Sequence, residues 1–348
     1  MKKRRKNGRV YMGPTNRETS EFLRKFSNKL CEKNGFSKCV SVDDIDEFTG
    51  NGVTESYFDI VYSASVGIKE LFDNPDARTD NYTFMKVFVS VLHEYTHIYQ
   101  RERLLHEKGS TSNFIALSYL AGSASEIYYN DSCNYKYMSD EIAAQYSALK
   151  NGYNILSQFV GKKKANSMIC DYVNKHINDE FVENSGKDYL KVDDIFDDYE
   201  KAFKKSRTAK RNFDRKEYNN VLDKFCQKHP DKNDEQIMNS ITDIPLKCLI
   251  KEKLSGKPSS FINAMENSKL GIYQDFVLAQ AYLNSCKENK QKYKELRALS
   301  SINFTFKIPS LKKTPEQIRF LNLSNVTPEF SFSAENLSDD YDFDNFDM

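Results

Sequence analysis

The sequence predicts an α+β fold in which helices predominate. Apolar residues recur at helical spacing from Tyr82 to about Ser300, whereas short β-branched and aromatic segments are confined to residues 38–65. No window approaches 18 uninterrupted apolar residues, so the sequence predicts no membrane span. With 348 residues, the chain can form two domains or one domain with a large extension.

Composition and the pattern of apolar and charged residues divide the chain into four segments. They are a basic N-terminal segment (1–16), a first domain (17–160), a helical region (161–300) and a C-terminal segment (301–348) with an acidic tail from about Ser333. The tail lacks any apolar period, so we expect it to be disordered. The basic start is not followed by an apolar stretch, and the seven cysteines form no C-x-x-C pair. We therefore expect no secretory signal, reduced thiols and a cytoplasmic protein.

The overall charge does not mark the chain as a binder of nucleic acids or membranes. The 51 lysine and arginine residues nearly balance the 50 aspartate and glutamate residues, so such a role would need a local patch. An acidic run at 193–200 is followed by a basic run at 201–216. Opposite charges on neighbouring turns favour a solvated helix over a nucleic-acid patch.

The N-terminal elements are one helix and one or two strands. The helix is expected over residues 17–35, where four apolar residues recur at helical spacing before Gly35. Strands are expected in residues 38–42 and 55–65, on either side of a glycine-containing turn at 50–52.

Two later helices have clear apolar faces. The first is expected over residues 81–105, and its apolar stripe is Phe84, Val87, Phe88, Val91, Tyr95 and Ile98. The second is expected to begin with Ser139 as its N-cap, and its apolar face is Ile142, Tyr146, Leu149 and Tyr153. Breaks in the helical pattern are expected near Gly109, Gly152, Gly161, Gly186, Pro230, Pro245 and Pro258.

The first of these helices carries an H-E-x-x-H pattern at residues 93–97. At about 100° per residue, His93 and His97 lie within roughly 40° of one another and about 150° from the centre of the apolar stripe. Both imidazoles can therefore reach one zinc ion at about 2.0–2.1 Å. Glu94 is the expected general base for a metal-activated water.

A catalytic zinc ion needs a third protein ligand. The metzincin pattern requires glycine at 100 and histidine at 103, but the chain has Gln100 and Arg103. His106 is a weaker candidate, because it lies at or beyond the end of the histidine helix. Glu141 is the better candidate, since it lies off the apolar face of the second helix and shares its side with small alanine residues.

Over residues 84–150 the chain resembles the gluzincin group of zinc metallopeptidases, in which an H-E-x-x-H helix is followed by a helix that supplies a glutamate. The resemblance implies a minimal zincin-like catalytic domain, built from a small sheet and these two helices, with a helical extension. It also implies one zinc ion per chain, with His93, His97 and Glu141 as ligands and Glu94 as general base. Many such enzymes have an aspartate where this chain has Gln145. The Gln145 amide oxygen can still accept a hydrogen bond from a ligand histidine.

Several assignments stay open at this stage. Asp140 and Glu126 compete with Glu141 for the third ligand position, although helix capping is the ordinary role of Asp140. Peptide hydrolysis also needs an oxyanion donor, for which the candidates are Tyr135, Tyr137, Tyr153 and His176.

The leading functional hypothesis is a zinc metallopeptidase that acts on a polypeptide substrate. One alternative is a sensor or regulator that cleaves one dedicated partner and is anchored to nucleic acid by its basic segments. A second alternative is a non-catalytic interaction protein with a vestigial metal site. The pattern indicates no other cofactor and no membrane partner.

Overall fold

The computed structural model describes residues 14–34, 40–43, 53–55, 63–67, 69–106, 111–175, 181–182, 188–285, 305–306, 310–312 and 331–333. Most of these residues lie in helices, which confirms the predominantly helical fold. Within the described part of the chain, no helix combines the length and hydropathy that a membrane crossing needs.

A first hydrophobic core lies among six helices and a small sheet. The helices are α1 (Asn16–Asn34), α2 (Lys69–Asp73), α3 (Asn81–His106), α7 (Ser139–Val160), α8 (Lys162–Lys175) and α9 (Val192–Thr208). The sheet has the order β1-β3-β2, with strands β1 (Val40–Asp43), β2 (Val53–Glu55) and β3 (Ser63–Gly67). β1 pairs parallel to β3, and β2 pairs antiparallel to it.

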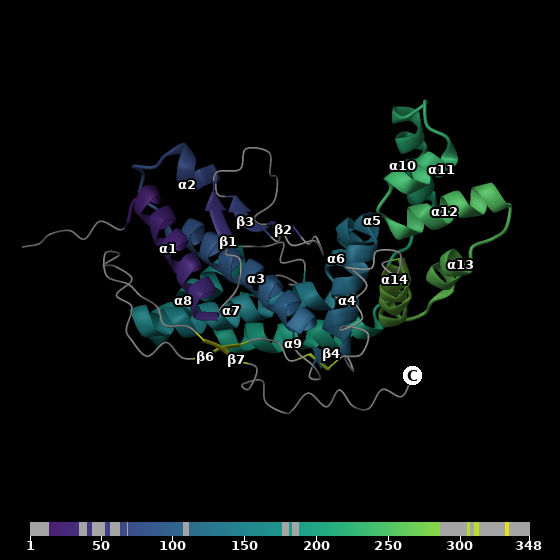
Figure 1. Cartoon of the computed structure of the whole chain (residues 1–348). Helices are drawn as coiled ribbons and strands as arrows, with labels where there is room; N and C mark the ends of the chain where they lie inside the picture. Colours follow the sequence, from purple (N-terminus) through teal and green to yellow (C-terminus); the bar gives the residue numbers. More distant parts are fainter. Residues whose placement is uncertain are drawn as a thin grey trace, which may run out of the picture.

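A second hydrophobic core lies among shorter helices. These are α4 (Asn113–Ala124), α5 (Glu126–Asn130), α10 (Arg215–Lys228), α11 (Asp234–Ser240), α12 (Ile244–Ser255), α13 (Ser260–Asn267) and α14 (Gly271–Ser285). The short helix α6 (Ser132–Tyr135) follows α5 in the chain. Figure 1 shows α10 to α13 standing at one end of the molecule, while α1, α2 and the sheet lie at the other end. The helices α3, α4, α6 and α7 lie between these two ends.

Two short strand pairs involve the C-terminal segment. β4 (Thr111–Ser112) pairs antiparallel with β5 (Thr305–Phe306), and β6 (Ser310–Lys312) pairs antiparallel with β7 (Ser331–Ser333). The expected disordered tail after Ser333 and the expected turn at 50–52 lie outside the described residues.

Most helices agree with the sequence pattern. α1 begins one residue before the expected helix, and α3 covers the expected residues 81–105. α7 ends at Val160, and its C-cap is Gly161, whose φ of 80° is a conformation that glycine adopts more easily than other residues. Pro230 and Pro258 lie between helices, and Pro245 lies in the first turn of α12, where its missing N–H costs no hydrogen bond.

Two details of α7 correct the sequence interpretation. Ser139 is not the N-cap: Met138 occupies that position, and the Ser139 side chain instead contacts the Ser206 hydroxyl at 2.7 Å. The helix also continues through Gly152, where a break was expected. Gly152 faces α3 and α8, since a Cβ there would lie 3.4 Å from the Phe88 ring and 3.7 Å from the Ile169 side chain.

The acidic run at 193–200 and the start of the basic run at 201–216 lie on one solvated helix, while Arg211 of the basic run is buried in an ion pair. α9 buries Val192, Ile195, Tyr199 and Phe203, and its charged residues occupy the other face, as the sequence predicts. The basic run, however, does not continue as one helix, because α9 ends at Thr208. Beyond it, Arg211 is fully buried and paired with Asp275 at 2.9 Å, so this residue cannot belong to a surface patch.

Candidate metal centre

Helix α3 carries two of the predicted ligands on the face opposite its apolar stripe. The stripe residues Phe84, Phe88, Val91 and Tyr95 are all buried in the first core. Tyr95 also donates a hydrogen bond from its hydroxyl to the backbone oxygen of Ser27, which fixes the rotation of α3 about its axis. His93 and His97 therefore point together towards α7, with their ring centroids 4.7 Å apart.

The first turn of α7 supplies the third predicted ligand. Glu141 is 2 % exposed and lies on the side of α7 that faces α3. Ala144 and Ala148 share this side and are fully buried. Their small side chains allow the two helices to approach closely, which brings the carboxylate to the imidazoles.

The three ligand atoms converge on one point. His93 Nε2 and His97 Nε2 are 3.0 Å apart, and Glu141 Oε2 lies 3.2 Å from the first and 3.3 Å from the second. A tetrahedral ion at about 2.0–2.1 Å from its ligands separates neighbouring ligand atoms by about 3.3–3.4 Å. Two histidines and one glutamate in this arrangement could hold a metal ion.

The other nitrogen of each imidazole faces an amide oxygen. His93 Nδ1 lies 2.9 Å from Gln145 Oε1, and His97 Nδ1 lies 2.9 Å from Gln100 Oε1. Because an amide oxygen can only accept, each Nδ1 donates its proton, and each Nε2 is the nitrogen that faces the ligand group. The predicted contact between Gln145 and a ligand histidine is confirmed.

His97 and Glu141 form a buried ion pair. Burial disfavours the charged form of His97, but the Glu141 carboxylate outweighs this effect and raises the pKa of His97 to about 10. Burial likewise favours the neutral form of Glu141, but the charge of His97 and hydrogen bonds from both histidines lower its pKa to about 2. At neutral pH the Glu141 carboxylate is therefore available as an anionic ligand.

Glu94 lies beside this group without belonging to it. Its side chain is buried, with 6 % of the residue exposed. Burial raises the pKa of Glu94, and Glu141 adds to this rise, whereas the charges of His93 and His97 oppose it. Glu94 is not one of the three residues whose ligand atoms converge.

Tyr135 is the oxyanion candidate that contacts the centre directly. Its hydroxyl donates a hydrogen bond of 2.7 Å to Glu141 Oε2, and its ring lies 5.3 Å from that of Phe181. Tyr137 instead lies under the ammonium group of Lys205. Tyr135 was one of four candidates in the sequence. Spacing alone could not rank them, because the distance from Tyr135 to Glu141 depends on tertiary packing.

The other open candidates are not brought to the ligand atoms. Tyr153 packs against Phe196, and the side chains of His106 and His176 lie outside the described residues. Glu126 is exposed in the first turn of α5. Asp140 is buried next to Glu141, but its carboxylate is not in the converging group.

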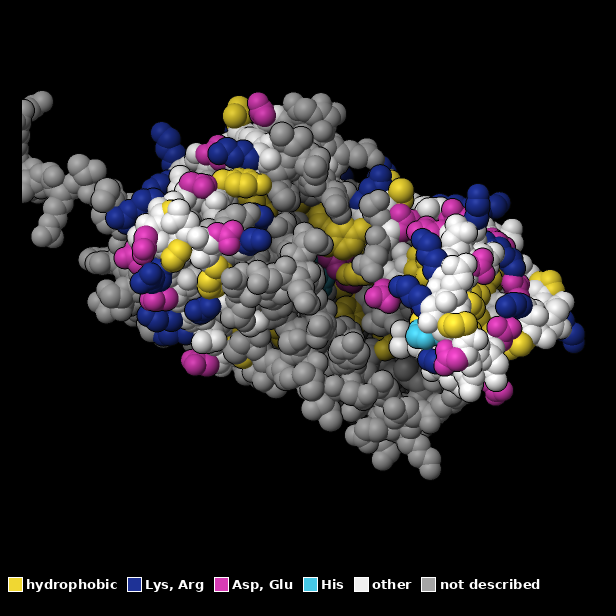
Figure 2. Space-filling model, turned by 90° about the horizontal axis from the view of Figure 1, so that it is seen from above, with side chains coloured by type: hydrophobic (Ala, Val, Ile, Leu, Met, Phe, Trp, Pro, Cys, Tyr) yellow, Lys and Arg dark blue, Asp and Glu magenta, His cyan; other side chains and the backbone are white. Residues whose placement is uncertain are grey.

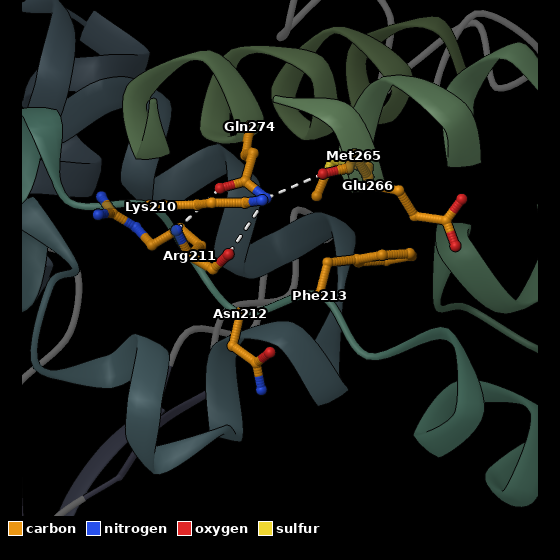
Figure 3. A pocket seen from close by; sticks show the side chains of 7 residues that line it. All are labelled: Lys210, Arg211, Asn212, Phe213, Met265, Glu266 and Gln274. Atoms are coloured by element: carbon orange, nitrogen blue, oxygen red, sulfur yellow. Dashed lines mark hydrogen bonds between the residues drawn. The ribbon is translucent and has the colours of Figure 1, made fainter. Parts of the chain in front are cut away.

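The molecule also has an apolar surface region and a cavity away from these ligand atoms. Seen from above, hydrophobic side chains gather near the middle of the molecule, between the part with α1 and α2 and the part with α10 to α13 (Figure 2). A separate cavity of about 310 Å³ lies at the second core and is lined by Lys210, Arg211, Asn212, Phe213, Met265, Glu266 and Gln274 (Figure 3). None of the predicted site residues lines it, so we do not associate this cavity with the metal centre.

No protein-family model, curated protein or solved structure matches the chain. The function is therefore inferred from the residues of the centre and their geometry.

Proposed function

We propose that the protein is a zinc-dependent metallopeptidase in which Glu94 acts as general base. The observation that carries this proposal is the convergence of His93 Nε2, His97 Nε2 and Glu141 Oε2 at 3.0–3.3 Å from one another. Glu94, the residue after the first ligand, is buried beside them. The H-E-x-x-H pattern and the gluzincin resemblance support zinc as the ion and peptide hydrolysis as the reaction.

The ligand set suits a catalytic rather than a closed structural zinc site. Structural zinc is usually held by four cysteine or histidine ligands, whereas three protein ligands leave one position for water or substrate. Bound zinc would polarise a water molecule and lower its pKa. Within this proposal, β1 to β3, α3 and α7 form the zincin-like catalytic domain, and the later helices form its extension.

The protein's own residues have distinct roles in the proposed reaction. Glu94 takes a proton from the attacking water and passes it to the leaving amine, since it lies beside the ligands but does not bind the ion. The raised pKa of Glu94 moves this carboxyl towards the range in which it can both accept and release a proton. Tyr135 donates to the carbonyl oxygen of the substrate, because its hydroxyl already reaches a ligand oxygen.

The direct test of the proposed activity is Glu94→Gln. This change keeps the size of the side chain and removes the base, so hydrolysis of an unstructured protein such as casein should fall by about 10²–10⁴-fold. Zinc content should not change, because Glu94 is not a ligand. The exposed Glu126→Gln is the control and should retain full activity. A Glu94→Gln protein that holds zinc and still cleaves at the wild-type rate would overturn the mechanism.

Zinc retained by the wild type without cleavage of any polypeptide would favour a vestigial site instead.

Tyr135→Phe serves as a second variant in the same assay. It keeps the aromatic packing against Phe181 and removes the hydroxyl, so it should lower turnover while zinc stays bound.

A further inference from the structure

Gln100 lies three residues after His97 on α3, and its side chain is fully buried at the contact with α7. Its amide makes two hydrogen bonds that point in different directions. The oxygen Oε1 faces His97 Nδ1 at 2.9 Å. The nitrogen Nε2 donates to the backbone oxygen of Asp140 at 3.0 Å.

The second bond fixes the orientation of the amide. A backbone carbonyl can only accept a hydrogen bond, so the NH₂ group of Gln100 must face Asp140. The amide oxygen must then face His97, and Nδ1 of that imidazole must carry a proton. The Asp140 carbonyl thus determines, through Gln100, that Nε2 is the nitrogen that His97 presents to a metal ion.

The same bond holds the turn of α7 that carries Glu141. Asp140 directly precedes this ligand in the first turn of the helix. Gln100 therefore positions ligands on both helices, one by its oxygen and one by its nitrogen. Gln145 differs, because among the described residues its side chain contacts the centre only at His93 Nδ1.

We propose that Gln100 is the positioning residue that assembles the metal centre, by selecting the His97 tautomer and by fixing the start of α7 against α3. The inference rests on the proposed zinc site, but not on peptide hydrolysis. Residues that orient metal ligands typically contribute 10–100-fold to metal affinity.

The first experiment measures zinc affinity of the full chain by competition with a chromophoric chelator. Gln100→Met has nearly the same shape and makes neither hydrogen bond, so its zinc affinity should fall by about 10–100-fold. Gln145→Met should lose less, because Gln100 still holds the first turn of α7 through the Asp140 carbonyl.

The matched control is Gln274→Met. Gln274 is also a fully buried glutamine, and its amide contacts the backbone of Arg211 and Met265 in the second core (Figure 3). This variant should lose stability to a similar extent but keep the zinc affinity of the wild type. An equal loss of zinc affinity in Gln100→Met and Gln274→Met would reduce the role of Gln100 to general stability and overturn the proposal.

A second measurement needs no variant that might fail to fold. ¹⁵N NMR of the zinc-loaded wild type reports which nitrogen of each histidine carries a proton. We expect a protonated Nδ1 and a zinc-bound Nε2 at His97. Zinc bound through Nδ1 of His97, or unchanged zinc affinity in Gln100→Met, would contradict the proposal.

These outcomes separate the inference from the proposed activity. A protein that shows the expected loss in Gln100→Met but cleaves no polypeptide would retain the role of Gln100 and lose the peptidase function. A wild type that binds no zinc would overturn both.

Discussion

At the scale of single residues, the centre holds a proton where it is proposed to hold a metal ion. In the metal-free protein His97 is an imidazolium paired with the Glu141 carboxylate, since its pKa is raised to about 10. Zinc is bound by neutral imidazole, so the ion must displace this proton. Glu141 contributes no proton above about pH 5, because its pKa is lowered to about 2.

We therefore predict that zinc uptake at pH 7 releases about one proton from His97. Calorimetric titrations in two buffers with different heats of ionisation measure this number. Release should diminish as the pH rises towards 10, where His97 loses its proton in the metal-free protein. Zinc binding without proton release at pH 7 would show that His97 is neutral or does not bind the ion.

Single residues also show what sequence spacing can predict. The i, i+4 spacing places His93 and His97 on one face of any helix, so the pair was predictable. Glu141 was predictable from the side of its helix that it shares with alanines. The role of Gln100 was not, because it depends on the Asp140 carbonyl of another helix. Its spacing of three residues from His97 was the only available signal.

At the scale of elements, helix α12 begins at a buried carboxylate. Asp243 is its N-cap and accepts hydrogen bonds from the Leu246 amide and the Ser125 hydroxyl. Burial nevertheless raises the pKa of Asp243 from 3.8 to about 6. The folded protein thus binds this proton more tightly than the unfolded chain. The resulting stabilisation is complete below about pH 3.8 and is lost as the pH rises through about 6.

We predict that Asp243→Asn removes the loss of stability that the wild type shows as the pH rises through about 6. Asparagine caps helices about as well as aspartate, and it carries no charge that must be buried. Relative to wild type, the free energy of unfolding of the variant should rise between pH 4 and 7 by up to about 3 kcal/mol, the equivalent of about two pKa units. Urea denaturation of both metal-free proteins measures this difference. Asp214→Asn, at the exposed N-cap of α10, is the control for the substitution itself. A difference that does not change with pH would contradict the assignment.

Element boundaries were less predictable than element existence. The prediction that Ser139 is the N-cap of α7 was wrong, because its hydroxyl contacts Ser206, 67 residues away in sequence. The predicted break at Gly152 was wrong because this glycine is buried inside α7 next to Phe88, where packing holds the helix together. Both errors have one cause: a tertiary contact outweighed the local preference of a residue.

At the scale of the whole molecule, the start of α7 lies beside both cores, because Met138 belongs to the second core and Ile142 to the first. The first core contains α3 and α7, and the second contains α4, α5 and α14. Near their junction, Arg211 and Asp275 form a fully buried ion pair, and Tyr128 donates to the same carboxylate at 2.8 Å. Composition alone suggested a solvated basic run there, because the sequence does not show that Asp275 packs against it.

The acidic tail after Ser333 is predicted to be dispensable for folding. Its few aromatic residues cannot bury enough surface to offset the entropy lost on ordering. Deletion of residues 334–348 retains β7 and should leave the midpoint of thermal unfolding unchanged. Loss of the cooperative transition in this truncated protein would show that the tail is part of the fold.

The central claim is that His93, His97 and Glu141 together hold one metal ion. Zinc content of the purified full chain, measured by mass spectrometry, tests it most directly. The account predicts about one zinc ion per chain in the wild type and in the control Glu126→Ala, and little or none in His93→Ala, His97→Ala and Glu141→Ala when circular dichroism shows that these variants are folded. Wild-type zinc content in folded His93→Ala and His97→Ala proteins, or loss of zinc in Glu126→Ala, would contradict it.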